Sequence, residues 1–276
     1  MRNCDKPNND FEEFFISCIT KHHILTKLSD IITATIQYDS KASLVALHEL
    51  QPLSIENLHP ITAKDLKDLY LQMSRKKGKQ RNTYDKLLAQ AKKNKCCFCS
   101  YEDPTELDHF LPKSKFPEFS ILLTNLIPSC KNCNSYKGTT IPNSAESSYI
   151  HPYYEKYDNY IWLEANLSFD CKDSLIIFYK ISTNLKAESP KLAARIEYQF
   201  KGLKLDERYA SWAITEVVNI EHMLKNLKDS AGKEKVRCHL NEQALSRKSV
   251  NKNSWQSALY HALYKSEKFY NMEWKI

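Results

Sequence analysis

Apolar residues in the first third of the chain recur at three- and four-residue steps, the spacing of helices with one buried face. Phe14, Phe15 and Cys18 begin this pattern, and Ile31 continues it. At Thr62, an acidic residue three positions later makes a helix start that resembles a capping box. The helices predicted here are 11–38, 42–50, one that begins at Thr62, and 84–93.

The pattern changes between residues 96 and 152, which contain six of the ten prolines. Short strands are predicted at 106–110 and 126–128, with a helix from about Lys131. Two further strands, 160–169 and 174–181, precede helices at 191–202, 205–228 and 253–269. This order predicts the α+β class: a small module of short strands embedded in mainly helical N- and C-terminal regions.

Composition supports a helix-rich globular protein. Only four glycines are present, so tight turns that need a positive φ are scarce. No run of about 18 apolar residues occurs, and the first residues lack the apolar segment of a signal peptide. We therefore expect a cytoplasmic protein without a membrane span.

The chain's positive charge, formally +7, is concentrated in one segment. Residues 75–95 contain nine lysines and arginines against the single acid Asp85, a local charge of +8 that could neutralise nucleic-acid phosphates. A solvated helix face or a flexible linker can have the same composition, so the charge alone leaves these interpretations open. The candidates for nucleic-acid binding are Lys76, Lys77, Lys79 and Arg81.

Nine cysteines are present, an odd number that does not suit a fully paired disulfide framework. Four of them form two Cys-x-x-Cys pairs, and each pair can supply two thiolates from one tight loop. This spacing predicts a structural Zn²⁺ bound by Cys96, Cys99, Cys130 and Cys133. The other cysteines are predicted to be small buried apolar residues: Cys4, Cys18, Cys97, Cys171 and Cys238.

The segment between the two pairs carries residues suited to phosphodiester chemistry. Asp108 and His109 are adjacent on a predicted strand, so their side chains face opposite sides and can have different roles. Asn134 follows Cys133 directly, in the first turn of a predicted helix. One carboxylate and one amide oxygen suit a hard cation such as Mg²⁺ or Mn²⁺ and leave room for water and phosphate.

This stretch resembles the ββα-metal core of the HNH (His-Me finger) endonucleases, in particular the endonuclease VII-like subgroup with a four-cysteine zinc. The resemblance covers about 45 of the 276 residues. It implies that His109 is the general base, that Asp108 and Asn134 bind a catalytic Mg²⁺ or Mn²⁺, and that Asn125 fixes the loop and orients the histidine. It also implies that Lys137 approaches the phosphate. Asn134 stands where many members have a final histidine, a feature that we assign to the subgroup.

A looser likeness, from His151 to Trp162, resembles the HNH proteins of bacterial phage-defence loci of the Septu type. His151 itself can be interpreted as a phosphate contact or as a buried packing residue. The regions expected are a helical N-terminal region (1–74), a basic lead-in (75–95), an HNH nuclease domain with the following strands (96–182), and a helical C-terminal region (183–276).

The resemblance implies metal-dependent hydrolysis of phosphodiester bonds in nucleic acid, with double-stranded DNA as the expected partner, in anti-phage defence. Two alternatives stay open. One is a non-catalytic, zinc-stabilised nucleic-acid-binding module, which would need the cysteines without Asp108, His109 and Asn134. The other is an interaction subunit whose helical flanks dock a partner ATPase.

Overall fold

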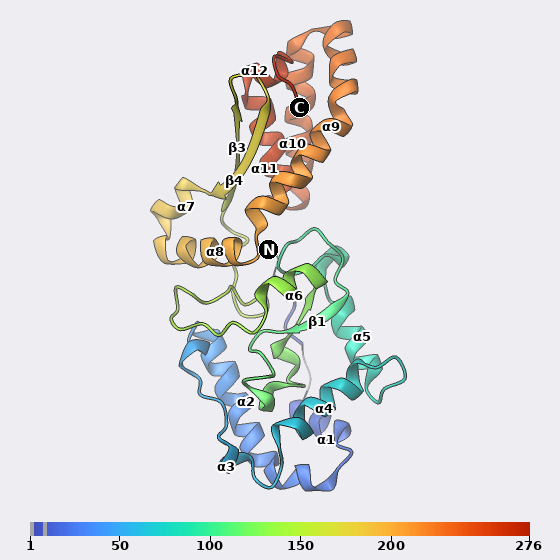
Figure 1. Ribbon diagram of the computed structural model, residues 1–276, viewed down its shortest axis with the longest axis vertical. Helices are drawn as coiled ribbons and strands as arrows, with labels where there is room; N and C mark the ends of the chain where they lie inside the picture. The colour runs from blue at the N-terminus through green and yellow to red at the C-terminus, as the bar shows by residue number, and fades with distance from the viewer. Residues whose placement is uncertain (1–2, 8–9) are drawn as a thin grey trace. The chain divides into compact units, whose positions relative to one another are not determined.

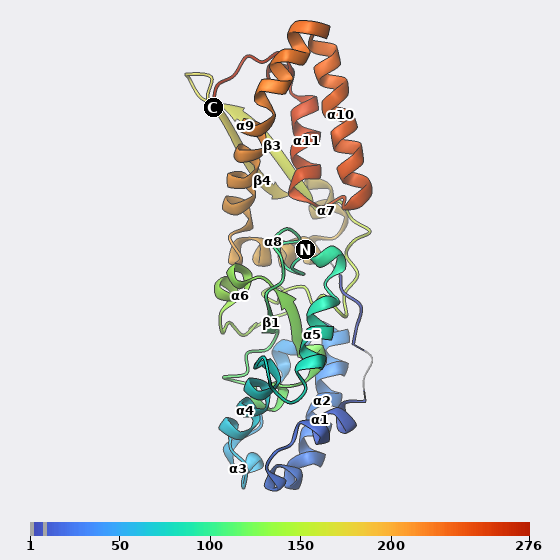
Figure 2. The ribbon, with the colours of Figure 1, turned by 90° about the vertical axis from the view of Figure 1, so that its right-hand side faces the viewer.

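The computed structural model describes residues 3–7 and 10–276. These residues form two compact units, one that ends at Tyr157 and one that begins at Asp158. Figures 1 and 2 show their elements. The described part of the chain combines many helices with two separate two-stranded sheets, which confirms the predicted α+β class. The regional boundaries expected from the sequence stay a prediction.

The first unit surrounds one short strand pair with helices. α4 begins with a capping box between Thr62 and Asp65, as the sequence predicts. In chain order the helices and strands of this unit are α1 (Phe11–Cys18), α2 (Leu28–Ser43), α3 (Ile55–Leu58), α4 (Ala63–Ser74), α5 (Arg81–Ala89), β1 (Glu106–His109), β2 (Leu126–Ser129) and α6 (Lys131–Lys137).

The single helix predicted over 11–38 is wrong, because α1 ends at Cys18 and a 3-10 segment, His22–Lys27, separates it from α2. A straight helix of that length would span roughly 42 Å. Phe15 and Ile31 instead lie in one hydrophobic core, which requires the chain to bend between them. The helix predicted over 42–50 is also wrong, since Val45 has a φ of 59° and only a 3-10 turn, Leu47–Glu49, follows.

β1 is held by the helices that precede it. Strand β1 pairs antiparallel with β2, so that Asp108 lies opposite Ile127. The Tyr70 hydroxyl of α4 donates to the Leu107 carbonyl at 2.9 Å, and the Leu107 amide donates to the Tyr84 hydroxyl of α5 at 3.2 Å. α5 packs against both strands, and Figure 1 shows it beside β1. The helical lead-in therefore fixes the strand that carries Asp108 and His109.

The second unit packs a hairpin on long helices. In β4 every second residue is buried, the pattern of a strand with one face on a core. β3 lies against α11 and β4 against α9, and Figure 2 shows α9, α10 and α11 together. The elements are β3 (Leu163–Phe169), β4 (Leu175–Ile181), α7 (Thr183–Glu188), α8 (Pro190–Gly202), α9 (Leu205–Ala231), α10 (Lys233–Val250), α11 (Trp255–Lys265) and α12 (Glu267–Tyr270).

Helix α10 was not predicted, and its burial explains why. It buries only Val236, Leu240 and Ala244, a stripe of one residue per turn that is too narrow to mark an amphipathic pattern. The helix predicted over 253–269 is divided at Ser266, whose extended backbone ends α11 and caps α12. Within the described residues, no helix combines the length and the apolar character that a membrane span requires.

Candidate metal centre and active site

The four cysteines of the two Cys-x-x-Cys pairs meet in one buried cluster. Their sulfur atoms all lie within 4.8 Å of one another, and the Cys99 and Cys130 sulfurs are 3.9 Å apart. Tetrahedral Zn²⁺ with Zn–S bonds of about 2.3 Å places its ligand sulfurs roughly 3.8 Å apart. The cluster is therefore compatible with a structural zinc ion. Cys130 also caps α6, because its sulfur accepts from the Cys133 amide.

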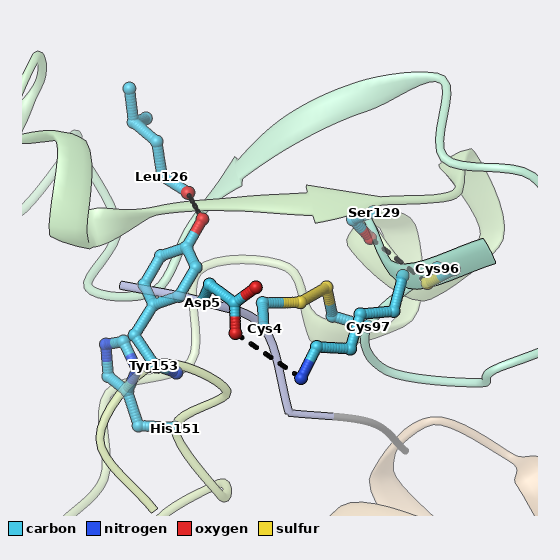
Figure 3. Close-up of a disulfide and its surroundings, with 9 residues drawn as sticks. Cys4, Asp5, Cys96, Cys97, Leu126, Ser129, His151 and Tyr153 are labelled. Atoms are coloured by element: carbon cyan, nitrogen blue, oxygen red, sulfur yellow. Dashed lines mark hydrogen bonds and ion pairs between the residues drawn. A yellow bond between two sulfur atoms is a disulfide. The ribbon is translucent and has the colours of Figure 1, made fainter. Parts of the chain in front are cut away.

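Cys97, inside the first pair, is not part of this cluster and forms a disulfide with Cys4 (Figure 3). The prediction that both are merely small packing residues is therefore wrong. The Cys4 amide donates to the Pro152 carbonyl at 2.9 Å, so the N-terminal segment joins the first pair to the segment that follows α6. Cys18 is buried as predicted, whereas Cys171 and Cys238 are exposed, contrary to the prediction.

Asp108 and His109 face opposite sides of β1. The His109 ring packs edge-on against Tyr70, with 4.4 Å between centroids, and its Nε2 lies 2.9 Å from the Ser120 carbonyl oxygen. A carbonyl can only accept, so Nε2 carries the proton and a neutral ring keeps its lone pair on Nδ1. Burial lowers the pKa of His109 to about 3, so the ring is neutral at pH 7.

On the other face, Asp108 is buried against Lys137 of α6. The Lys137 ammonium lies 3.1 Å from Asp108 Oδ2 and donates to the His109 carbonyl at 2.7 Å. Only 3% of Lys137 is exposed, so this ammonium neutralises a buried carboxylate instead of facing solvent. Burial raises the pKa of Asp108 to about 6, although Lys137 opposes the shift.

Glu106 completes this face and was missed by the sequence analysis. It lies two residues before Asp108, so strand alternation places both carboxylates on one side of β1. Its Oε1 accepts from Asn134 Nδ2 of α6 at 2.9 Å. The structure thus gathers the predicted ligands Asp108 and Asn134 around a further acid, a set of oxygen donors that suits Mg²⁺ or Mn²⁺. The alternation itself was the signal that could have identified Glu106.

Asn125 fixes the loop between β1 and β2. Its side chain is completely buried, donates to the Leu111 and Phe119 carbonyls and accepts from the Leu111 amide. Phe119 directly precedes Ser120, whose carbonyl accepts from the His109 ring. Asn125 is therefore hydrogen-bonded to the residue next to Ser120, and the Ser120 carbonyl orients the histidine ring.

Asn125 is in turn linked to α2 and to the segment after α6. The Tyr38 hydroxyl lies 3.1 Å from Asn125 Oδ1 and 3.0 Å from His151 Nε2. Because the Tyr153 amide donates to His151 Nδ1, a neutral His151 carries its proton on Nε2 and donates to Tyr38. Tyr38 then donates to Asn125. His151 is 1% exposed, which supports its interpretation as a packing residue.

Tyr38→Phe is expected to lower the free energy of unfolding by about 1–3 kcal/mol, because the buried His151 Nε2–H loses its acceptor. Urea unfolding measures this loss. In a double-mutant cycle with His151→Phe, the two substitutions should be non-additive, since both remove the same Tyr38–His151 hydrogen bond. Strictly additive losses would show that the pair is not coupled.

The four basic candidates fall into two groups. Lys76, Lys77 and Lys79 are exposed on the turn between α4 and α5. Arg81 instead pairs with Asp85 at 2.8 Å and stacks over Tyr84. At Gly78 an added Cβ would lie 1.6 Å from the Gln72 carbonyl oxygen, so this glycine allows the lysine turn to pack closely on the end of α4.

The geometry thus defines a short antiparallel strand pair and a following helix. Four clustered cysteine sulfurs lie between them, and the same elements carry acidic, amide and imidazole side chains. The chain is similar to Protein ea31 of Escherichia phage lambda, with 27% identity over 238 residues, 81% of this chain and 79% of that protein. It is also similar to the Septu protein PtuB of Bacillus thuringiensis, with 38% identity over 79 residues.

That second match covers 27% of this chain and 30% of PtuB. The activity of PtuB as a whole protein therefore cannot be assigned to this chain from the match. No family profile and no solved structure matches the chain. Together, the two relatives and the cysteine cluster support a phage- or defence-related, HNH-like protein.

Proposed function

We propose that this protein is a metal-dependent endonuclease of the HNH type that hydrolyses phosphodiester bonds in DNA. The observation that carries the proposal is the arrangement on β1. His109 lies on one face with its ring oriented by the Ser120 carbonyl, and Asp108 lies on the other beside Glu106 and Asn134.

His109 is the general base in this proposal. Its Nε2 is committed to the Ser120 carbonyl, so Nδ1 is the atom that accepts a proton from water. Burial keeps the ring neutral, and a phosphate bound beside it would raise its pKa by attraction between opposite charges. Asn125 keeps the loop, and with it the acceptor for Nε2, in place.

Asp108, Asn134 and Glu106 are the residues that would hold the catalytic cation. The set fits by its chemistry, because all three side chains offer oxygen, the donor atom that Mg²⁺ and Mn²⁺ prefer. Lys137 already carries a compensating charge for Asp108. A bound Mg²⁺ or Mn²⁺ would stabilise negative charge on the scissile phosphate and on the leaving oxygen.

Zinc in the four-thiolate cluster has a structural role in this proposal. Zn²⁺ enclosed by four cysteines has no open position for substrate. The cluster joins Cys96 and Cys99, which precede β1, to the N-terminus of α6. It thereby sets the distance between Asp108 on the strand and Asn134 on the helix.

A role in defence against phage is supported by the similarity to a Septu protein, whereas the other relative is itself a phage protein. A partner ATPase stays a prediction. The test of the function is cleavage of a supercoiled plasmid with Mg²⁺ or Mn²⁺ and with EDTA. Metal-dependent nicking supports the proposal, whereas DNA binding without cleavage would favour the non-catalytic, zinc-stabilised module.

Simultaneous replacement of Lys76, Lys77 and Lys79 by alanine is expected to weaken DNA binding equally for all sequences. Each phosphate contact contributes about −0.9 to the slope of log affinity against log salt, so the slope should flatten by at most about 2.7. Fluorescence anisotropy at several salt concentrations measures this slope. Arg81 is left intact because it pairs with Asp85 and Tyr84.

The matched control replaces three exposed lysines of the second unit, Lys191, Lys235 and Lys275, and removes the same charge. An equal loss of affinity in both triple variants would show a general effect of net charge. Unchanged affinity in the first variant would instead favour an acidic protein partner for the turn.

A further inference from the structure

The cation assigned to the phosphate by resemblance, Lys137, does not face the solvent side of the site. It is 3% exposed, and its ammonium contacts the Asp108 carboxylate and the His109 carbonyl. In this structure the Lys137 ammonium is held by these two partners on the Asp108 side of β1. A phosphate-binding cation beside the His109 ring must therefore come from another element.

Lys113, in the loop after β1, is placed for this role. Its ammonium lies 4.2 Å from the centroid of the Tyr70 ring, and the same ring packs against His109 with 4.4 Å between centroids. Tyr70 is itself fixed, because its hydroxyl donates to the Leu107 carbonyl of β1. One rigid aromatic ring thus positions both the proposed base and a lysine.

Lys113 also interacts electrostatically with the charged groups of the site. Burial lowers the pKa of Lys113, whereas the charges of Asp108 and Glu106 raise it. After burial, Lys113 is the largest cause of the lowered pKa of His109. In the part of the chain that the structure describes, Lys113 forms no ion pair within 4.0 Å. Its ammonium, unlike that of Lys137, is therefore available to an anion.

We propose that Lys113 contacts the scissile phosphate of the substrate, held in place by the ring of Tyr70. This inference rests on the proposed function and assigns the substrate contact to a residue of the β1–β2 loop. A partly desolvated ammonium binds a phosphate oxygen more strongly than a fully hydrated one does. As charge develops on the phosphate oxygens during hydrolysis, the same ammonium stabilises it.

The kinetic test compares Lys113→Ala, Lys113→Arg and a matched control, Lys115→Ala, which removes an exposed lysine of the same loop. Single-turnover plasmid nicking at saturating protein measures the chemical step. We expect Lys113→Ala to slow it by about 10²-fold, the usual effect of losing one charge-stabilising donor. Lys113→Arg should retain most of the rate, and Lys115→Ala should stay within about twofold, with unchanged zinc content and melting temperature in all three.

A wild-type rate in Lys113→Ala, or equal losses in the Lys113→Ala and Lys115→Ala variants, would overturn the inference. A second measurement does not depend on cleavage. The lysines of the wild-type protein are acetylated with and without a short DNA duplex, and mass spectrometry measures how far each lysine is modified. DNA should protect Lys113 about fivefold or more and protect Lys115 less.

The two measurements separate the inference from the proposed function. An inactive wild-type protein whose Lys113 is protected by DNA would contradict the nuclease proposal and support the phosphate contact. An active protein whose Lys113 is not protected would support the nuclease and contradict the contact. Failure of both cleavage and protection would refute both.

Discussion

His109→Ala is expected to reduce plasmid cleavage by at least about 10²-fold, the range typical for the loss of a general base. The proposed metal ligands Asp108 and Glu106 lie on the opposite face of β1, and Asn134 lies on α6, so the substitution leaves them in place. Single-turnover nicking with Mg²⁺ measures the effect. Zinc content should stay at about one ion per chain.

Loss of the buried ring could also disturb packing, because His109 contacts Tyr70 and the Ser120 carbonyl. His109→Gln separates the two effects, since a glutamine amide can still donate to that carbonyl but cannot accept a proton from water. It should be as inactive as His109→Ala while melting near the wild-type temperature. His22→Ala, which alters an exposed histidine, is the control for activity. Full cleavage by the His109→Gln variant would exclude His109 as the base.

The parts of the site that the sequence predicted depend on short-range patterns. Two cysteines three residues apart can form a metal-binding loop in any fold, and adjacent residues on a strand face opposite sides. The Cys96–Cys99 pair, the Asp108–His109 alternation and the Thr62 capping box could therefore be predicted without knowledge of the fold.

The missed features depend on contacts between distant segments. Tyr38 and His151 are 113 residues apart, and Cys4 and Cys97 are 93 residues apart. No local pattern marks such pairs, because only tertiary packing brings them together. Lys137 illustrates the same limit: its helical position was predicted, but its burial against Asp108 depends on how α6 packs on β1.

Cys130→Ser is expected to abolish zinc binding and to unfold the segment that carries the site. Structural zinc contributes apparent binding free energies of about 10–16 kcal/mol, comparable to or larger than the whole stability of a typical domain. Serine is a good helix N-cap, so the cap that Cys130 provides for α6 is preserved and the loss reports on the metal alone. Elemental analysis and thermal unfolding by circular dichroism measure the two effects.

The control is Cys238→Ser, which changes an exposed cysteine of α10 and should leave zinc content and melting temperature unaltered. The functional consequence follows from α6, which carries both Asn134 and Lys137 and is joined to the β1 segment through the four thiolates. Once the ion is lost, the helix is no longer tied to Cys96 and Cys99, so Asn134 and Asp108 lose their fixed separation. Cleavage should therefore disappear together with zinc. A Cys130→Ser protein that retains one zinc ion, its melting temperature and its activity would show that the four cysteines do not form the ligand set.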